Sequence, residues 1–197
     1  MNASGVVLAG GRSTRMKFNK AFAEIGGKSS LQIILDKFNT VFSETIIICN
    51  NPELYAGMTD KIYTDVYPSL GPVAGIHSGL YHASSDMVFV LGCDIPFIDT
   101  RLIGFMMDQL EGYQAVVPQV GGRLQPLAAL YSRSCLPVFE RCLQEDKLKL
   151  VRVFEELDTL IIPETELASF GKVEEIFFNV NDAAALQKAQ ELAGRLL

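Results

Sequence analysis

The sequence is poor in the side chains that hold structural metals or disulfides. It contains two histidines and four cysteines in 197 residues, and no two cysteines form a Cys-x-x-Cys pair. Because His77 and His82 complete no zinc pattern with them, we expect packing or helix-surface roles for both histidines and no zinc site. The cysteines are expected to be buried thiols in a reducing compartment. They are Cys49, Cys93, Cys135 and Cys142.

Long apolar runs and basic stripes are also missing from the sequence. No segment approaches the run of about 20 uncharged residues that a membrane span requires. No basic stretch precedes an apolar one near the first residue, as a secretory signal would require. The formal net charge is -6, which argues against nucleic acid as a partner. We therefore expect a cytoplasmic protein that binds neither membranes nor nucleic acid.

What the chain does contain is an alternation of apolar strand-like runs and amphipathic helical segments. Hydrophobic residues make up 49% of the chain and charged residues 20%, which is typical of a compact domain. No Pro-, Gly- or Ser-rich linker divides it, so residues 1–197 are expected to form one domain. The order predicts a three-layer α/β/α fold around a mainly parallel, Rossmann-like sheet. Expected strands are 5–9, 45–49, 61–64, 87–92, 115–118, 127–131 and 159–162.

Helices are expected between these strands. Apolar spacing predicts one over 31–42, with Ser29 or Ser30 as its cap. A second begins at Pro72, and Gly75 and Gly79 on one face would let it lie close to the sheet. Further helices are expected at 100–110, 134–143, 148–157 and 182–197. In such folds ligands bind beyond the carboxyl ends of the strands, which decides where to look for a site.

The segment 8–21, which begins at the end of the first expected strand, combines paired glycines with basic residues. Gly10 and Gly11 allow backbone amides to approach an anion because no Cβ intervenes. Positive charge follows at Arg12, Arg15, Lys17 and Lys20. The segment is neither a dinucleotide fingerprint nor a P-loop, because the glycine spacing of both is absent. It predicts a third kind of polyphosphate site, the alternative being a solvated strand-to-helix turn.

Polar residues follow the next strands. Asp94 ends a strongly apolar strand just before Pro96, where its carboxylate is suited to Mg²⁺ or, alternatively, to a turn or cap. Asp65 is suited to accept hydrogen bonds from a ribose or base, and Asn50 to contact a base edge. Each has an ordinary turn role as its alternative. Asn181 or Asp182 is also expected to cap the final helix.

Together these segments resemble the molybdenum cofactor guanylyltransferase family, within the wider nucleotidyltransferase group. The resemblance spans nearly the whole chain and rests on five motifs in order. They are the nucleotide loop with Leu8-Ala9-Gly10-Gly11, Arg15 and Lys20-Ala21, then Gly71-Pro72-Val73-Ala74-Gly75, Cys93-Asp94-Ile95-Pro96, Gln125-Pro126-Leu127 and Asn179-Val180-Asn181.

The resemblance implies a sheet of the nucleotide-diphospho-sugar transferase type. It also implies Mg²⁺-dependent transfer of GMP from GTP to the terminal phosphate of molybdopterin, with release of pyrophosphate. GTP and molybdopterin are the implied partners, with cofactor-synthesis or acceptor apoenzymes as candidate protein partners. Asp94, Lys20 and Arg15 are the implied catalytic residues, and Asp94 the metal ligand. The implied nucleotide contacts are Leu8, Ala9, Gly10, Gly11, Lys20, Asn50, Asp65 and Asp94, and the implied pterin-side contacts are Gln125, Asn179 and Asn181.

Three positions bear on how closely the family pattern holds. Gly10 favours guanine over cytosine, because related cytidylyl members tend to carry Ala there and a missing methyl leaves room for a purine. Lys17 stands where the family usually has Gly, and Asn19 where it usually has Asp, which removes a negative charge beside Lys20. The alternatives are therefore a nucleotidyltransferase that uses CTP or another phosphate acceptor, and a non-catalytic nucleotide-binding module.

Overall fold

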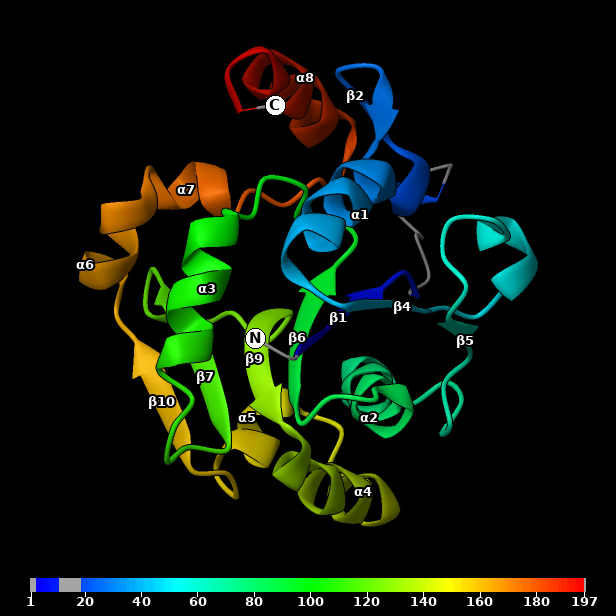
Figure 1. Ribbon diagram of the computed structural model, residues 1–197, viewed down its shortest axis with the longest axis vertical. Coiled ribbons are helices and arrows are strands. Elements are labelled where there is room, and N and C mark those ends of the chain that lie inside the picture. Colours follow the sequence, from blue (N-terminus) through cyan, green and yellow to red (C-terminus); the bar gives the residue numbers. More distant parts are fainter. Residues whose placement is uncertain (1–2, 11–18, 197) are drawn as a thin grey trace.

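A mixed β-sheet with helices on both faces forms the centre of the molecule (Figure 1). The computed structural model describes residues 3–10 and 19–196. Within these residues the sheet has eight strands in the order β10-β7-β9-β6-β1-β4-β5, with β8 paired to β7. These strands are β1 (Ala3–Leu8), β4 (Glu44–Ile48), β5 (Ile62–Tyr63), β6 (Met87–Gly92), β7 (Ala115–Val120), β8 (Arg123–Leu124), β9 (Ala128–Ser132) and β10 (Thr159–Ile162). The expected three-layer, mainly parallel α/β fold is confirmed.

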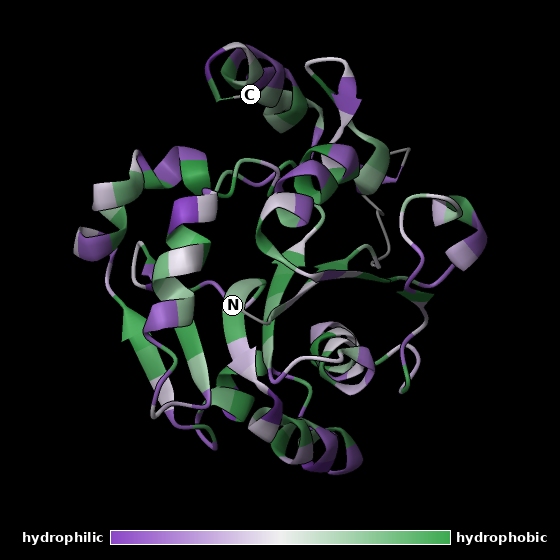
Figure 2. Ribbon diagram, viewed as in Figure 1, coloured by the Kyte–Doolittle hydropathy of each residue, from purple (hydrophilic) through white to green (hydrophobic). Residues whose placement is uncertain are grey.

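Alternating side chains on the strands face two separate helix layers. Val7, Phe89 and Leu91 belong to a core with helices α1 (Ser30–Val41) and α3 (Thr100–Asp108). Val6 and Val90 face the opposite way, toward α2 (Pro72–His82), α4 (Leu136–Gln144) and α5 (Leu150–Phe154). Both faces of the central strands are thus covered, which explains their nearly continuous apolar sequences. In Figure 2 these strands are correspondingly green.

Helix α2 lies close to strand β1 because glycines face it. A Cβ on Gly79 would lie 2.8 Å from Val6 Cγ1, and one on Gly75 would lie 3.1 Å from Leu8 Cδ1. The expectation that these two glycines allow close packing is confirmed. Pro72 occupies the first turn of α2, as the sequence predicts.

Strand β9 runs antiparallel to both of its neighbours, β6 and β7. The residues that precede β9 therefore lie at the same edge of the sheet as the residues that follow β6. This reversal places Leu127, directly before β9, beside Gly92 at the end of β6, where Gly92 N donates to the Leu127 carbonyl at 2.8 Å.

A short hairpin and the last helix pack together as a separate unit at one end of the molecule, outside the three layers (Figure 1). The hairpin pairs β2 (Glu24–Ile25) with β3 (Lys28–Ser29) and turns at Gly26 and Gly27, both with positive φ. Its apolar side packs on α8 (Ala183–Leu196) through residues that include Ile25 and Leu192. The remaining short helices are η1 (Lys20–Phe22), η2 (Pro52–Tyr55), η3 (Arg133–Cys135), α6 (Glu164–Leu167), η4 (Ala168–Phe170) and α7 (Val173–Ile176).

Helix caps agree with the sequence in two places. Ser29 caps α1 by accepting the amide of Gln32, which leaves Ser30 to donate to the Cys93 carbonyl. Asp182 accepts the amide of Ala185 at the start of α8, so Asn181 is not needed for capping. Across residues 3–10 and 19–196, no helix has both the length and the apolar character to cross a membrane.

A buried carboxylate, that of Glu44, lies at the amino ends of the parallel strands. Glu44, at the start of β4, accepts hydrogen bonds from Ser4, Lys61 and the amide of Ser84. Burial opposes its ionisation, but these hydrogen bonds outweigh burial and lower the pKa of Glu44 to about 2. The charge therefore stabilises the fold at a distance from the carboxyl edge of the strands.

Candidate active site

A cavity of about 590 Å³ lies beyond the carboxyl ends of the parallel strands. Each of β1, β4, β5 and β6 supplies residues to its wall just after the strand ends. Its lining is Leu8, Ala9, Gly10, Asn19, Lys20, Ile48, Cys49, Asn50, Asp65, Ser69, Gly71, Pro72, Gly75, Gly92, Cys93, Asp94 and Leu127. The general rule for ligand binding in open α/β sheets therefore holds for this cavity.

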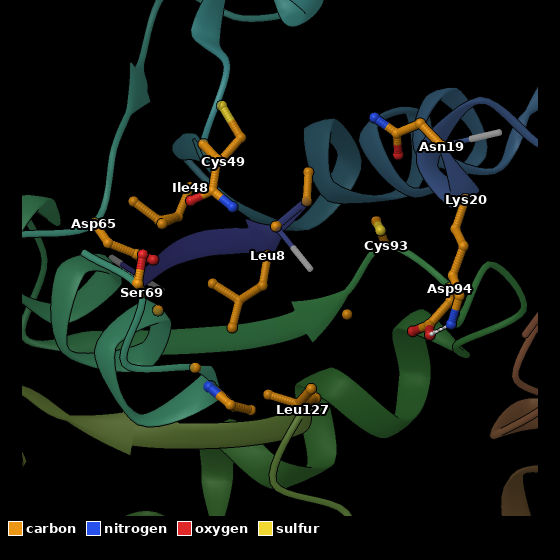
Figure 3. A pocket seen from close by; sticks show the side chains of 17 residues that line it. Leu8, Asn19, Lys20, Ile48, Cys49, Asp65, Ser69, Cys93, Asp94 and Leu127 are labelled. Carbon is orange, nitrogen blue, oxygen red and sulfur yellow. Dashed lines mark hydrogen bonds and ion pairs between the residues drawn. The ribbon is translucent and has the colours of Figure 1, made fainter. Parts of the chain in front are cut away.

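The two ends of the cavity differ in chemistry (Figure 3). Lys20 and Asp94 form a charged end, whereas Asp65 and Ser69 lie together at the other end, with Leu8 between. Ser69 has a positive φ of 66°, a backbone conformation that is uncommon for residues other than glycine. An elongated ligand with an anionic end and a polar, hydrogen-bonding end matches this distribution.

Lys20 and Asp94 come from segments distant in sequence and meet at the charged end. The Lys20 Nζ lies 3.4 Å from Asp94 Oδ2, and it also donates to Asn181 Oδ1. The two partners are brought together because Val180 N donates to the Asp94 carbonyl at 2.8 Å, which ties the segment before α8 to the turn after β6. Asp94 and Asn181 thus already hold one cationic group between oxygen atoms.

Asp65 has an unusual environment for a carboxylate. Its Oδ1 is buried and has no hydrogen-bond partner among the described residues. Burial raises the pKa of Asp65. An unpaired buried oxygen is costly, and a ligand that donates a hydrogen bond to it would remove that cost. Asp65 therefore points to a ligand hydroxyl or N–H group at this end of the cavity.

The cavity wall between these ends is largely apolar and backbone. Burial raises the pKa of Cys49 to about 11 and that of Cys93 to about 12, so both are neutral thiols at pH 7. They act as small lining groups and offer no nucleophile. All four cysteines are free and buried, as the sequence predicts. Gly10 lies beside Asn50, whose Nδ2 would be 3.7 Å from a Cβ built on Gly10.

The structure brings together most of the residues that the sequence analysis selected. Of the residues selected from the sequence, those that line the cavity are Leu8, Ala9, Gly10, Lys20, Asn50, Asp65 and Asp94. Asn181 joins them through its bond to Lys20. Gly11 and Arg15, and with them Arg12 and Lys17, lie outside the described residues.

None of the three predicted pterin-side residues is part of the cavity wall, and only Asn181 is bonded to a residue that is, Lys20. Gln125 directs its side-chain amide to the Arg123 carbonyl, and its neighbour Leu127 lines the cavity instead. Asn179 is absent from the lining, although its carbonyl accepts the amide of Asn181 at 3.2 Å. Their expected substrate contacts remain predictions.

Asn19 and Tyr55 were not singled out as site residues from the sequence. Asn19 lines the cavity, but its side chain turns toward Tyr55 and the amide of Ala21. Although Asn19 brings no negative charge to Lys20, the lysine has a carboxylate partner in Asp94. The sequence signal for Asn19 was its departure from the family pattern, whereas Tyr55 had none.

Comparisons with known proteins identify the family of this chain. Residues 5–160 match the family model described as the MobA-like NTP transferase domain. A protein named probable molybdenum cofactor guanylyltransferase from Pelotomaculum thermopropionicum is 36% identical over 193 residues, covering 98% of this chain and 94% of the relative.

Solved structures show the same fold. The molybdopterin-guanine dinucleotide biosynthesis protein A from Archaeoglobus fulgidus superimposes with a TM-score of 0.85 at 25% identity, covering 98% of this chain and 99% of that one. The 2-C-methyl-D-erythritol 4-phosphate cytidylyltransferase from Thermus thermophilus has a TM-score of 0.72 at 17% identity, covering 98% of this chain and 100% of that one. The latter likeness concerns the fold alone. With the sequence match over most of its length, the chain belongs to the MobA-like nucleotidyltransferase family, among the molybdenum cofactor guanylyltransferases.

Proposed function

We propose that this protein transfers GMP from GTP to the terminal phosphate of molybdopterin, releasing pyrophosphate. The observation that carries the proposal is the meeting of Lys20, Asp94 and Asn181 at one end of the strand-end cavity. A cation neutralises phosphate charge and a carboxylate can hold a metal ion, which suits phosphoryl transfer because its catalysis is chiefly positioning and charge neutralisation. The names of the relatives supply guanine and the molybdenum cofactor as the substrate classes.

The proposed reaction needs no nucleophile from the protein. An oxygen of the acceptor phosphate attacks the α-phosphorus of GTP. The bond from that phosphorus to the bridging oxygen breaks, and pyrophosphate leaves with the electron pair. Lys20 neutralises charge on the phosphates as it develops. At the other end, Asp65 accepts a hydrogen bond from the ribose or base and thereby satisfies its unpaired oxygen.

The oxygen donors at the charged end fit Mg²⁺. Asp94 and Asn181 already place two oxygens around one cationic group, and Mg²⁺ prefers oxygen ligands. Across residues 3–10 and 19–196, no three His, Cys, Asp or Glu side chains gather into a metal cage. Mg²⁺ on Asp94 would thus share its other positions with substrate phosphates and water, orienting the phosphates and offsetting their charge.

The test is release of pyrophosphate in the presence of molybdopterin. GTP, CTP, ATP and UTP are compared as donors, with and without Mg²⁺ and with EDTA. The proposal expects turnover with GTP only when molybdopterin and Mg²⁺ are both present. Turnover with CTP in place of GTP would indicate the cytidylyl alternative, and GTP binding without turnover would indicate a non-catalytic module.

Two variants test the charged end. Asp94→Ala is expected to lower turnover by orders of magnitude with the fold intact, and Lys20→Ala to impair mainly the use of GTP. Asp36→Ala is a matched control, because it also breaks an aspartate–lysine ion pair, that of Asp36 with Lys28 on the surface. Turnover by Asp94→Ala close to that of Asp36→Ala would remove Asp94 from the mechanism.

A further inference from the structure

Tyr55 lies behind the cavity and joins two segments of its wall. It ends η2, the short helix after β4, and only 2% of the residue is exposed. Its hydroxyl donates to the Ala9 carbonyl at 2.9 Å. The same oxygen accepts a hydrogen bond from Asn19 Nδ2 at 2.8 Å. Ala9 and Asn19 both line the cavity and flank residues 11–18 in the sequence.

The direction of this chain of hydrogen bonds is fixed by its chemistry. The Asn19 Oδ1 accepts the amide of Ala21 at 3.1 Å, so the atom that faces Tyr55 is the donor Nδ2. The Tyr55 oxygen must therefore accept from Asn19, and its single proton goes to the Ala9 carbonyl. The Tyr55 hydroxyl thus accepts from Asn19 and donates to Ala9, and the bond from Asn19 keeps the hydroxyl proton directed at the Ala9 carbonyl.

The Ala9 carbonyl matters because of the amide that follows it. In a trans peptide the carbonyl and the next N–H point in opposite directions. A carbonyl held toward Tyr55 therefore aims the Gly10 N–H away from Tyr55, and Gly10 lines the cavity whereas Tyr55 does not. The Ala9 N–H is held separately by the Ile48 carbonyl at 2.9 Å. Both sides of Ala9 are thus anchored.

Asn19 links the Tyr55 hydroxyl to the segment that begins at Lys20. It caps η1, whose first residue is Lys20, so the position of Asn19 determines where the lysine leaves the backbone. The Tyr55 hydroxyl thus restrains both the peptide that carries the Gly10 amide and the cap that precedes Lys20. A polyphosphate contacts both kinds of group at once, so their spacing governs its affinity.

We propose that Tyr55 is a positioning residue for the nucleotide, with Asn19 as the group that orients its proton. This inference rests on the proposed function in that the ligand is a nucleoside triphosphate. The ring of Tyr55 stacks on Phe22, with centroids 5.4 Å apart. Tyr55→Phe keeps that stacking and the buried ring, so its effect reports on the hydroxyl alone.

Tyr55→Phe and Asn19→Asp test the two links of the chain. Tyr55→Phe removes the donor to Ala9. In Asn19→Asp the carboxylate oxygen that faces Tyr55 is an acceptor, and a charged acceptor competes strongly for the hydroxyl proton. The Ala9 carbonyl then loses its donor although Tyr55 is still present.

The expected result is a rise of about tenfold in the Kd and KM for GTP in each single variant, equivalent to about 1.4 kcal/mol. The kcat should change less than threefold. Because both changes break the same bond, the double variant should show the same rise as Tyr55→Phe alone. Kd is measured by titration with GTP and Mg²⁺ and KM by pyrophosphate release, at a temperature where every variant is folded.

Thr59→Val is the matched control for lost stability. It also removes a hydroxyl that donates to a backbone carbonyl, that of Thr45 at 2.9 Å, but at the opposite end of β4 from the cavity. Its Kd for GTP should equal that of the wild type. A Kd for Tyr55→Phe within twofold of the wild type would overturn the proposal, as would equal effects of Tyr55→Phe and Thr59→Val, or additive effects in the double variant.

Failure of the proposed function would look different. If the wild type binds CTP, ATP or UTP more tightly than GTP, the substrate assignment fails. The same variants are then titrated with the preferred triphosphate, where the tenfold loss is still expected. If the wild type binds no triphosphate, both proposals are wrong.

Discussion

Gly92 ends β6 two residues before Asp94, and a methyl group there would press on the Asp94 carboxylate. A Cβ built on Gly92 lies 2.8 Å from Asp94 Oδ1, whereas its other neighbours, on Leu127, are 3.7 Å or more away. The carboxylate oxygen must withdraw by about 0.6 Å to reach the 3.4 Å at which ordinary contact begins. Gly92→Ala therefore displaces one functional group and little else.

The expected cost falls on activity and not on stability. The obstructed atom is at the end of a side chain, and Gly92 does not have a positive φ. An alanine also reduces the entropy of the unfolded chain, which is worth about 0.4–1 kcal/mol in favour of folding. A misplacement near 1 Å in a catalytic site costs about 10²-fold. We therefore expect kcat/KM to fall by about 10- to 100-fold while Tm is unchanged or slightly raised.

The assay is pyrophosphate release from GTP with molybdopterin, alongside thermal unfolding of the same samples. A crystal structure of the variant would show Asp94 displaced and its 3.4 Å contact with Lys20 altered. If Gly92→Ala kept more than half of the wild-type kcat/KM, the position of the Asp94 carboxylate would not limit the reaction, and the role given to this residue would be wrong.

Three other substitutions have clear expectations. Gly79→Ala places a Cβ 2.8 Å from Val6 in the core, so the free energy of unfolding should fall by about 1–3 kcal/mol in urea denaturation, with kcat/KM kept while the protein is folded. Glu44 has a folded-state pKa of about 2 against an ordinary 4.5, so its stabilisation is complete above pH 4.5 and is lost as the pH falls toward 2; Glu44→Gln should flatten this part of the unfolding profile. Gly10→Ala adds a methyl that clears Asn50 by 3.7 Å, so the fold should tolerate it while the ratio of kcat/KM for GTP to that for CTP falls; an unchanged ratio would remove Gly10 from base selection.

Much of the fold was predictable because the apolar pattern of each element is strong. The strands Met87–Gly92 and Thr159–Ile162 have the predicted bounds, and each of the other predicted strands differs by at most two residues at either end. The direction of β9 was not predictable, because parallel and antiparallel strands can carry the same apolar run. The β2–β3 hairpin is not among the expected strands, because each of its strands has only two residues.

Some residues of the candidate site were likewise predictable from the sequence and others were not. Residues directly after a strand, such as Asp65 and Asp94, were found because the carboxyl edge of a parallel sheet is a known location for ligands. The role of Tyr55 was not predicted, because the sequence around a loop tyrosine does not show whether it packs in the core, lies in solvent or donates to a carbonyl. The pairing of Asn181 with Lys20 depends on a tertiary contact between distant segments, which no local pattern encodes.

The two ends of the cavity draw their side chains from different parts of the sequence. The groups at the Asp65 end lie on or just after strands β1, β4 and β5 in the first half of the chain, whereas Asn181 comes from the segment before α8, where the Val180 amide donates to the Asp94 carbonyl. On the proposed function, substitutions in the segment before α8 are expected to change the use of the phosphate acceptor more than the binding of the nucleoside.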